Sequence, residues 1–292
     1  MISTWLRVIR IRFLLASVIA VSNGLAISYW KYHTIDPIYA VLTYVGVIFL
    51  HASVDLLNDY WDYKRGIDIA TKRTKFSGGT GVLPENLLAP RTVYIAGLVF
   101  LILGASIGAY FIVMRGVAIA IILGFVVIAI YFYSTRIVNA GLGELFEAIK
   151  GAMIVLGSLY VQNAVLEPAA IYGGAIVGIL SATVLFINSF PDYEADKSKG
   201  RRTLVIILGR KTASTIFPMF MIAAYALIAG GIFFGLTTVY SLISFVSMPF
   251  AIKSALSLRK DPQGIDNIVP AMASTVTYSR ITGFLLALSY IL

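Results

Sequence analysis

Cysteine is absent from the 292 residues, and histidine occurs only twice, at His33 and His51. Disulfides and thiolate metal sites are therefore excluded, and a bound metal would need oxygen ligands or one of these histidines. Charged residues are also scarce, at 13%, whereas hydrophobic residues make up 59% and the mean hydropathy is +0.88. This composition has too much apolar surface for a soluble domain and indicates an all-α polytopic membrane protein.

Nine hydrophobic stretches are long enough to cross a bilayer as helices. They fall at roughly 8–30, 37–57, 93–114, 117–135, 144–165, 169–189, 212–235, 238–257 and 267–292. The first lacks a small-residue cleavage site, so we interpret it as a membrane helix and not as a signal peptide. We expect one transmembrane domain, 1–292, built as a bundle around a central cavity. Its helices form two similar groups of four followed by a ninth, and its long connections, about 59–92 and 190–211, carry the catalytic residues.

Basic residues are distributed unevenly along this predicted topology. With the N-terminus inside, the cytoplasmic segments hold nineteen Lys and Arg, and the opposite side holds two, Lys31 and Arg115. Such a positive-inside bias explains the net charge of +9 without nucleic acid as a partner. It predicts a multi-pass protein of the cell membrane whose two long connections face the cytoplasm. The odd number of helices leaves the C-terminus outside.

Two acidic stretches end hydrophobic runs where a membrane protein usually has few carboxylates. In the first acidic stretch, residues 58–68, the polar side chains continue a stripe along one face of the preceding helix. The stripe consists of His51, Asp55, Asn58 and Asp62, with Asp59 beside it. In the second acidic stretch, residues 188–200, Asp192 and Asp196 lie one helical turn apart, at the end of the sixth predicted helix, with Asn188 a turn before them.

Carboxylates one above another at the end of a membrane helix need a positive charge nearby to offset their unfavourable free energy. An ionised carboxylate in the bilayer costs roughly 2.5–3.5 kcal/mol, and like charges one turn apart repel. A divalent cation would relieve both effects, and all-oxygen ligands favour Mg²⁺, which is commonly shared with substrate phosphates. Nearby basic side chains are suited to the remaining phosphate charge: Lys64, Lys72, Arg73, Arg136, Arg201 and Arg202. The pattern therefore predicts a diphosphate site, and the surrounding apolar helices predict a lipid tail on its ligand.

The two motifs resemble the signatures of a known family. Asn58-Asp-x-x-Asp62 continuing to Gly66-Ile67-Asp68, with Asp192-x-x-x-Asp196 continuing to Gly200-Arg201-Arg202-Thr203-Leu204, resembles the paired motifs of the UbiA superfamily of intramembrane prenyltransferases over essentially the whole chain. Gly78-Gly79-Thr80-Gly81-Val82-Leu83 and Leu142-Gly143-Glu144 resemble its menaquinone branch, whose members prenylate 1,4-dihydroxy-2-naphthoate. The run Phe190–Asp196 resembles the vitamin K2-forming animal relatives. Some members carry an acid where this chain has Gly66, and here the third carboxylate is Asp68.

The resemblance implies an enzyme that ionises a polyprenyl diphosphate with Mg²⁺ and transfers the allylic cation to an aromatic acceptor. It implies three kinds of site residue. The metal ligands are Asn58, Asp62, Asp192 and Asp196, with Asp59 and Asp68 as supporting acids. The diphosphate-binding residues are Lys72, Arg73, Arg201, Arg202, Asn23 and Ser134. The catalytic residues are Asp62, Asp192, Asp196, Tyr131 and Arg136, the tyrosine stabilising the cation through its ring.

Other interpretations stay open at this stage. Another UbiA-type acceptor, such as 4-hydroxybenzoate, haem or a glycerol phosphate lipid, would fit the same motifs. A cation-coupled transporter would also place carboxylates in a repeated bundle, but its site usually lies at the bilayer midplane and not at helix ends. A structural or assembly protein leaves the duplicated acids unexplained. The sequence predicts no protein partner and does not identify the residue that accepts the final proton.

Overall fold

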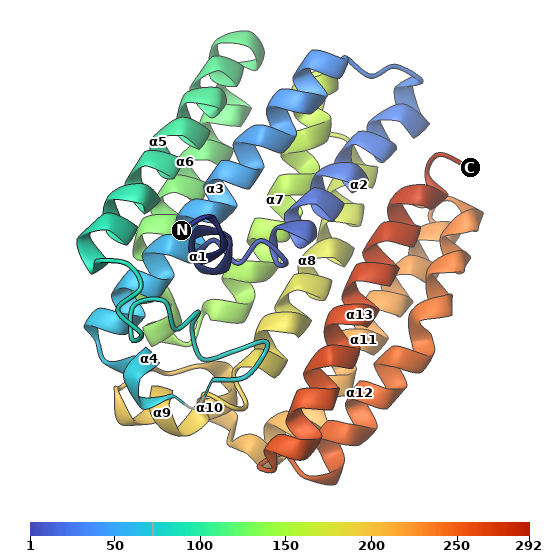
Figure 1. Cartoon of the computed structure of the whole chain (residues 1–292). Helices are drawn as coiled ribbons and strands as arrows, with labels where there is room; N and C mark the ends of the chain where they lie inside the picture. The colour runs from blue at the N-terminus through green and yellow to red at the C-terminus, as the bar shows by residue number, and fades with distance from the viewer. Residues whose placement is uncertain (72) are drawn as a thin grey trace.

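Every regular element of the computed structural model, which describes residues 1–71 and 73–292, is helical. The elements are α1 (Ile2–Val8), α2 (Leu14–Tyr32), α3 (Pro37–Lys64), α4 (Ile67–Ala70), α5 (Pro90–Arg115), α6 (Val117–Phe132), a π-helical turn η1 (Tyr133–Ile137), η2 (Val138–Ala140), α7 (Gly143–Asn163), α8 (Pro168–Asn188), α9 (Tyr193–Ser198), α10 (Leu204–Leu208), α11 (Arg210–Phe233), η3 (Val239–Ser247), α12 (Met248–Lys260) and α13 (Ile265–Ser289). Figure 1 shows the long helices side by side in one bundle, with α4, α9 and α10 gathered at one end. The predicted all-α membrane bundle is confirmed.

Each of the nine predicted stretches forms a long helix or a pair of consecutive helices within the described residues. Seven of these segments are long and apolar enough to cross a membrane. The other two, α7 and α13, have 21 and 25 residues and run in the same bundle. The N-terminal part of α7 carries Glu144, Glu147 and Lys150, so it is more polar than a helix that faces lipid all round. Glu147 and Lys150 line the interior cavities described below, and Glu144 is buried.

The helix that carries the first acidic stretch is longer than its apolar run. Its N-terminus is capped by Asp36, whose carboxylate accepts the backbone N–H groups of Ile38 and Tyr39 at 2.9 and 3.0 Å. From there α3 continues for 28 residues to Lys64, past the predicted hydrophobic end at residue 57. The added turns keep Asn58, Asp59 and Asp62 on a regular helix, so the periodic stripe predicted from the sequence is present, and Asp68 follows on α4.

The second acidic stretch has a different backbone from the predicted one. The sequence predicted that Asp192 and Asp196 continue the preceding helix, but α8 ends at Asn188 and a turn separates it from α9. Pro191 lies in that turn, and a proline interrupts a helix because it lacks an N–H group and clashes with the preceding turn. Asp196 therefore lies on α9, and Asp192 is the residue directly before its first turn.

The N-terminal boundary also differs from the prediction. The first hydrophobic stretch was expected to be one helix from residue 8, but α1 ends at Val8 and α2 begins at Leu14. Arg10, between them, has a left-handed backbone with φ of 52°, which a continuous α-helix cannot contain. Helix α1 packs across α3, where Val8 and Leu56 belong to one buried cluster (Figure 1).

Helices α7 and α8, which follow one another in the chain, pack closely. A Cβ atom built on Gly178 would lie 2.2 Å from the carbonyl oxygen of Ala148, and one on Gly151 would lie 2.9 Å from Gly178. Only glycine allows the two backbones to approach this closely, as in many membrane helix pairs. The approach aligns the charged end of α7 with the end of α8, where the second acidic stretch begins.

Candidate active site

A polar cavity lies where the two acidic stretches meet. It is lined by residues of α2, α3, α4, α7, α8, α9 and α13 and of the connections between them. Its carboxylate and amide residues are Asp55, Asn58, Asp62, Asp68, Glu147, Asn188, Asp192 and Asp196. The fold therefore brings the polar stripe of α3 to the second acidic stretch, more than a hundred residues later in the chain.

Arg201 joins the two stretches directly. Its guanidinium donates to Asp62 through Nη2 and to Asp196 through Nη1, the latter at 3.2 Å. Its side chain is only 10% exposed. Burial opposes the charge of Arg201, but the carboxylates of Asp62 and Asp196 outweigh burial and raise its pKa. The residue is therefore a fixed cation at the centre of the polar cavity.

Several oxygen atoms in this cavity make no hydrogen bond within the described residues. They are Asp55 Oδ2, Asp68 Oδ2, Asn188 Oδ1 and Asp192 Oδ1. Burial raises the pKa of Asp192 to about 7, and the charge of Asp196 adds to this effect. Burial also raises the pKa of Asp196 to about 6, although Arg201 acts in the opposite direction. Protons therefore compete with any cation for these carboxylates near neutral pH.

The glycine-rich connection closes over the acids. Gly79 has a φ of 69°, and a Cβ atom at this position would lie 2.4 Å from the Asp68 carboxylate. Gly78, with a φ of 82°, presents its backbone N–H to Asp192. These two glycines thus link a carboxylate of the first acidic stretch to one of the second. Both need a left-handed backbone that residues with a Cβ rarely adopt.

Asp59 lies outside the polar cavity, although it precedes Asp62 by less than one turn. Its carboxylate accepts hydrogen bonds from Arg10, at 2.7 Å, and from the hydroxyl of Thr80, and its side chain is 1% exposed. Asp59 is rotated by about 100° around the helix axis from its neighbour Asn58, and Arg10 and Thr80 hold its carboxylate on the side of α3 that faces the N-terminal turn. Asp59 instead joins α3 to the N-terminal turn and to the connection that follows the first acidic stretch.

The other predicted residues near the first stretch occupy different surroundings. Ser134 is buried and donates to Asn58 Oδ1 at 2.7 Å, so it orients a residue that lines the cavity. Tyr131 is 37% exposed and lies against Tyr94 of α5, away from the cavity. Asn23 is buried between helices, where its amide donates to the carbonyls of Ile19 and Gly283. It is not among the residues that line either cavity.

The predicted basic residues also separate into groups. Arg201 lines the cavity, whereas Arg136 and Arg202 are exposed and do not line it. Arg73 binds Glu85 at 2.5 Å, together with Arg7 at 2.8 Å. Lys72 lies outside the described residues.

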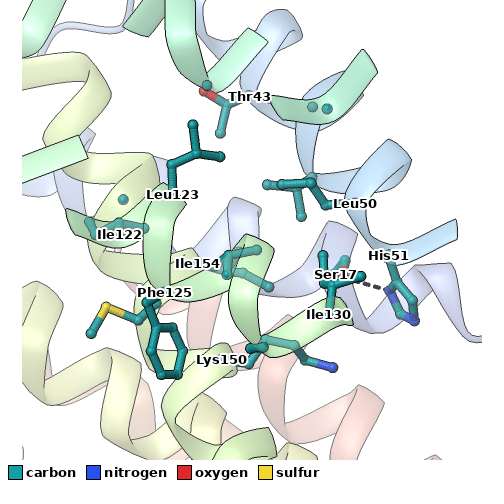
Figure 2. A pocket seen from close by; sticks show the side chains of 18 of the residues that line it. Ser17, Thr43, Leu50, His51, Ile122, Leu123, Phe125, Ile130, Lys150 and Ile154 are labelled. Atoms are coloured by element: carbon teal, nitrogen blue, oxygen red, sulfur yellow. Dashed lines mark hydrogen bonds between the residues drawn. The ribbon is translucent and has the colours of Figure 1, made fainter. Parts of the chain in front are cut away.

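A second, apolar cavity continues from the first between α3, α5, α6 and α7. The two share a neck, formed by Ser17, His51, Val54, Tyr133, Glu147, Lys150 and Ile154. Figure 2 shows Ser17, His51 and Lys150 at one end of the apolar cavity and Thr43 at the other. Its empty space, counted together with the solvent at its open side, is about 1080 Å³.

The neck contains the functional candidates that the sequence patterns did not indicate. Tyr133 faces both cavities, whereas Tyr131, two residues earlier, faces outward. Glu147 and Lys150 form an ion pair on α7, and the hydroxyl of Ser17 is 2.7 Å from His51 Nδ1. A charged pair within a spanning helix was the available signal, because such residues usually mark function.

The cavity pair, lined by carboxylates at one end and apolar side chains at the other, has the form of a site for an amphipathic ligand inside a membrane bundle. The UbiA prenyltransferase family model matches residues 16–272, so the chain belongs to this family. It is therefore a prenyltransferase, an enzyme that transfers alkyl groups other than methyl.

Relatives and solved structures support this assignment across nearly the whole chain. The 1,4-dihydroxy-2-naphthoate octaprenyltransferase of Bacillus subtilis is 26% identical, with 96% of this chain and 89% of the relative covered. The enzyme of the same name from Escherichia coli is 24% identical, with coverage of 99% and 95%. A UbiA homologue from Archaeoglobus fulgidus, solved with DMAPP and Mg²⁺, superimposes with a TM-score of 0.68 at 17% identity, covering 97% of this chain and 99% of that one.

Proposed function

We propose that this prenyltransferase transfers a polyprenyl group from its diphosphate to 1,4-dihydroxy-2-naphthoate, a reaction of menaquinone biosynthesis, and that it requires Mg²⁺. One observation carries the proposal: a cavity with acids from both motifs joins an apolar cavity between α3, α5, α6 and α7. The diphosphate occupies the polar cavity and the isoprenoid chain occupies the apolar one. This arrangement brings the first carbon of the chain to the neck.

The residues of the polar cavity fit Mg²⁺. The free oxygens of Asp68, Asn188 and Asp192 provide hard ligands, and Asp62 and Asp196 lie beside them. Within residues 1–71 and 73–292 no three acidic or histidine side chains form a ready-made metal site. This agrees with Mg²⁺ that is held by one or two carboxylates and completed by substrate phosphates. When bound, Mg²⁺ supplies positive charge to the leaving diphosphate.

The residues of the chain itself have separate tasks in this proposal. Arg201 provides a fixed positive charge where negative charge develops on the leaving diphosphate, and preorganised charge of this kind lowers the barrier. Ser134 holds Asn58, and Gly78 and Gly79 hold Asp192 and Asp68. The apolar lining of the second cavity excludes water from the allylic cation, which would otherwise be hydrolysed.

The naphthoate is favoured as acceptor by the two relatives named above and by the motifs of the glycine-rich connection. The positive-inside distribution of Lys and Arg supports a cytoplasmic polar cavity, so that the diphosphate and the acceptor arrive from the cytoplasm. Prenyl transfer to 4-hydroxybenzoate, haem or a glycerol phosphate lipid is the alternative within the family.

Incubation of the purified protein with Mg²⁺, a labelled polyprenyl diphosphate and a panel of acceptors tests the acceptor. We expect labelled prenyl-naphthoate by chromatography. Label that reaches only another acceptor would overturn the naphthoate assignment and keep the family reaction. Addition of EDTA should stop transfer, and excess Mg²⁺ should restore it. Turnover that is unchanged by EDTA would contradict the metal requirement.

A further inference from the structure

A charged pair outside both acidic stretches lies at the neck between the two cavities. Lys150 Nζ and Glu147 Oε1 are 2.6 Å apart, one turn from each other on α7, and both residues line both cavities. Their side chains are 27% and 18% exposed. Packed apolar residues often serve stability as well as a buried ion pair does, so stability alone does not account for this pair.

The ammonium group of Lys150 has capacity left for a ligand. It carries three N–H donors. Within the described residues it makes one hydrogen bond, to Glu147, and this bond uses one of the three donors. An anion at the neck would therefore find a cation that is already oriented by a neighbouring carboxylate. Arg201 serves the polar cavity, and Lys150 is the corresponding cation at the neck.

An aromatic wall stands beside this cation. Phe146 precedes Lys150 by one turn on the same face of α7 and stacks on Phe125 of α6, with ring centroids 5.5 Å apart and an interplanar angle of 16°. Both rings line the apolar cavity. Figure 2 shows Phe125 and Lys150 at the same end of that cavity. A flat apolar surface next to a cation matches a ligand that is an aromatic carboxylate.

We propose that Lys150 binds the carboxylate of the acceptor, whose ring lies against Phe125 and Phe146. The inference rests on the proposed function and adds the residue that selects acidic aromatic acceptors. With the diphosphate among the acidic stretches and the chain in the apolar cavity, the reacting carbon lies at the neck. An acceptor held by Lys150 is next to that carbon. Glu147 is a positioning residue that fixes the ammonium.

Equilibrium binding tests the proposal without requiring turnover. We would titrate the purified protein with 1-hydroxy-2-naphthoate and with 1-naphthol, which lacks the carboxylate. The wild-type protein should bind the naphthoate more tightly than the naphthol, by on the order of 10- to 100-fold, the range for a hydrogen-bonded charge pair. Lys150→Gln should remove this preference while its affinity for 1-naphthol stays the same, which shows an intact neck.

Two variants serve as controls. Lys150→Arg retains the cation and should retain the preference for the carboxylate. Lys253→Gln removes an exposed lysine of α12 that lines neither cavity and should bind like the wild type. Equal binding of the two ligands by the wild-type protein, or an unchanged preference in Lys150→Gln, would overturn the proposal.

The acceptor panel described above separates this inference from the proposed function. A Lys150-dependent preference for the carboxylate without transfer to the naphthoate would reject the proposed acceptor and keep the binding site. If the protein transfers the prenyl group to the naphthoate, but Lys150→Gln leaves the binding preference for the carboxylate unchanged, the proposed acceptor is kept and the Lys150 binding site is rejected. Kinetics add a second readout, because Lys150→Gln should raise KM for the acceptor and leave KM for the polyprenyl diphosphate unchanged.

Discussion

The two acidic stretches reach the same cavity on different backbones. Asp59 and Asp62 of the first lie on the last turns of the continuous helix α3, where Asp62 lines the cavity and Asp59 is held by Arg10, and Asp68 follows on α4. The second follows a break at Pro191, and both Asp192 and Asp196 line the cavity. Similar motifs in sequence are therefore not equivalent in space. The acid that turns away from the cavity is Asp59 in the first stretch, buried against Arg10, and Glu194 in the second, exposed and paired with Arg210.

The largest effect on turnover is expected at Asp62 and Asp196, the acid of each stretch that pairs with Arg201. Asp62→Asn and Asp196→Asn each remove one carboxylate from Arg201 and from the proposed metal ligands. Each should lower kcat by on the order of 10²- to 10³-fold, as loss of a preorganised electrostatic group does. Steady-state turnover in proteoliposomes measures this, with the melting temperature as control for folding. If one variant retained full turnover, the two stretches would not share one site.

The glycine-rich connection offers the next test, because it touches both stretches. Gly79→Ala forces a Cβ toward Asp68 and strains a left-handed backbone by about 1–2 kcal/mol. We expect turnover to fall by about tenfold or more through displacement of Asp68. Gly235→Ala is the matched control, since Gly235 has a similar φ of 66° but open space around it. Equal losses of turnover in both variants would mean that strain alone matters.

Protons should compete with a divalent cation for the carboxylates of the polar cavity near neutral pH, which they would not do for exposed carboxylates of ordinary pKa. Burial raises the pKa of Asp192 to about 7, and burial and the charge of Asp62 raise that of Asp68 to about 8. These groups hold protons below those values, so affinity for a divalent cation should rise as pH increases from 6 to 8. Electron paramagnetic resonance of Mn²⁺ binding without diphosphate measures this effect of the protein alone. Affinity that is constant over this range would contradict protonated carboxylates.

The smallest effect on chemistry is expected at Asp59. Asp59→Asn removes the charge that Arg10 faces in a buried site, so we expect a loss of stability of about 1–3 kcal/mol. Turnover of the folded fraction and its half-saturating Mg²⁺ concentration should stay close to wild type. Thermal unfolding and Mg²⁺ titration measure the two quantities. A large rise in the Mg²⁺ requirement would return Asp59 to the metal ligands that the sequence predicted.

The sequence predicted the bundle and the meeting of the two stretches because both depend on local patterns. Apolar runs determine the spanning helices, and the spacing of His51, Asp55, Asn58 and Asp62 determines a face of α3. Which neighbour of an acid turns away depends on packing against distant segments. Asp59 required Arg10 and Thr80, which local spacing does not reveal.

The other predictions that differ from the structure also depend on packing against distant segments. Tyr131 and Tyr133 belong to one short aromatic run, and only the position of α6 against α5 determines that Tyr131 faces Tyr94 and Tyr133 faces the neck. The turn at Pro191 was visible in the sequence as a helix breaker, but the matching Asp spacing favoured a continuous helix. Lys150 gave no motif at all, because its role depends on a cavity formed by several helices.

The bridge of Arg201 also constrains how the protein is made. Asp62 and Arg201 are separated by 139 positions, and α5, α6, α7 and α8 lie between them in the chain. During synthesis the first acidic stretch emerges long before the cation that neutralises it. A carboxylate left unpaired in a buried site is strongly unfavourable, so the early helices gain little by closing around Asp62 on their own. Final docking of the N-terminal helices should therefore wait for the second acidic stretch to emerge from the ribosome.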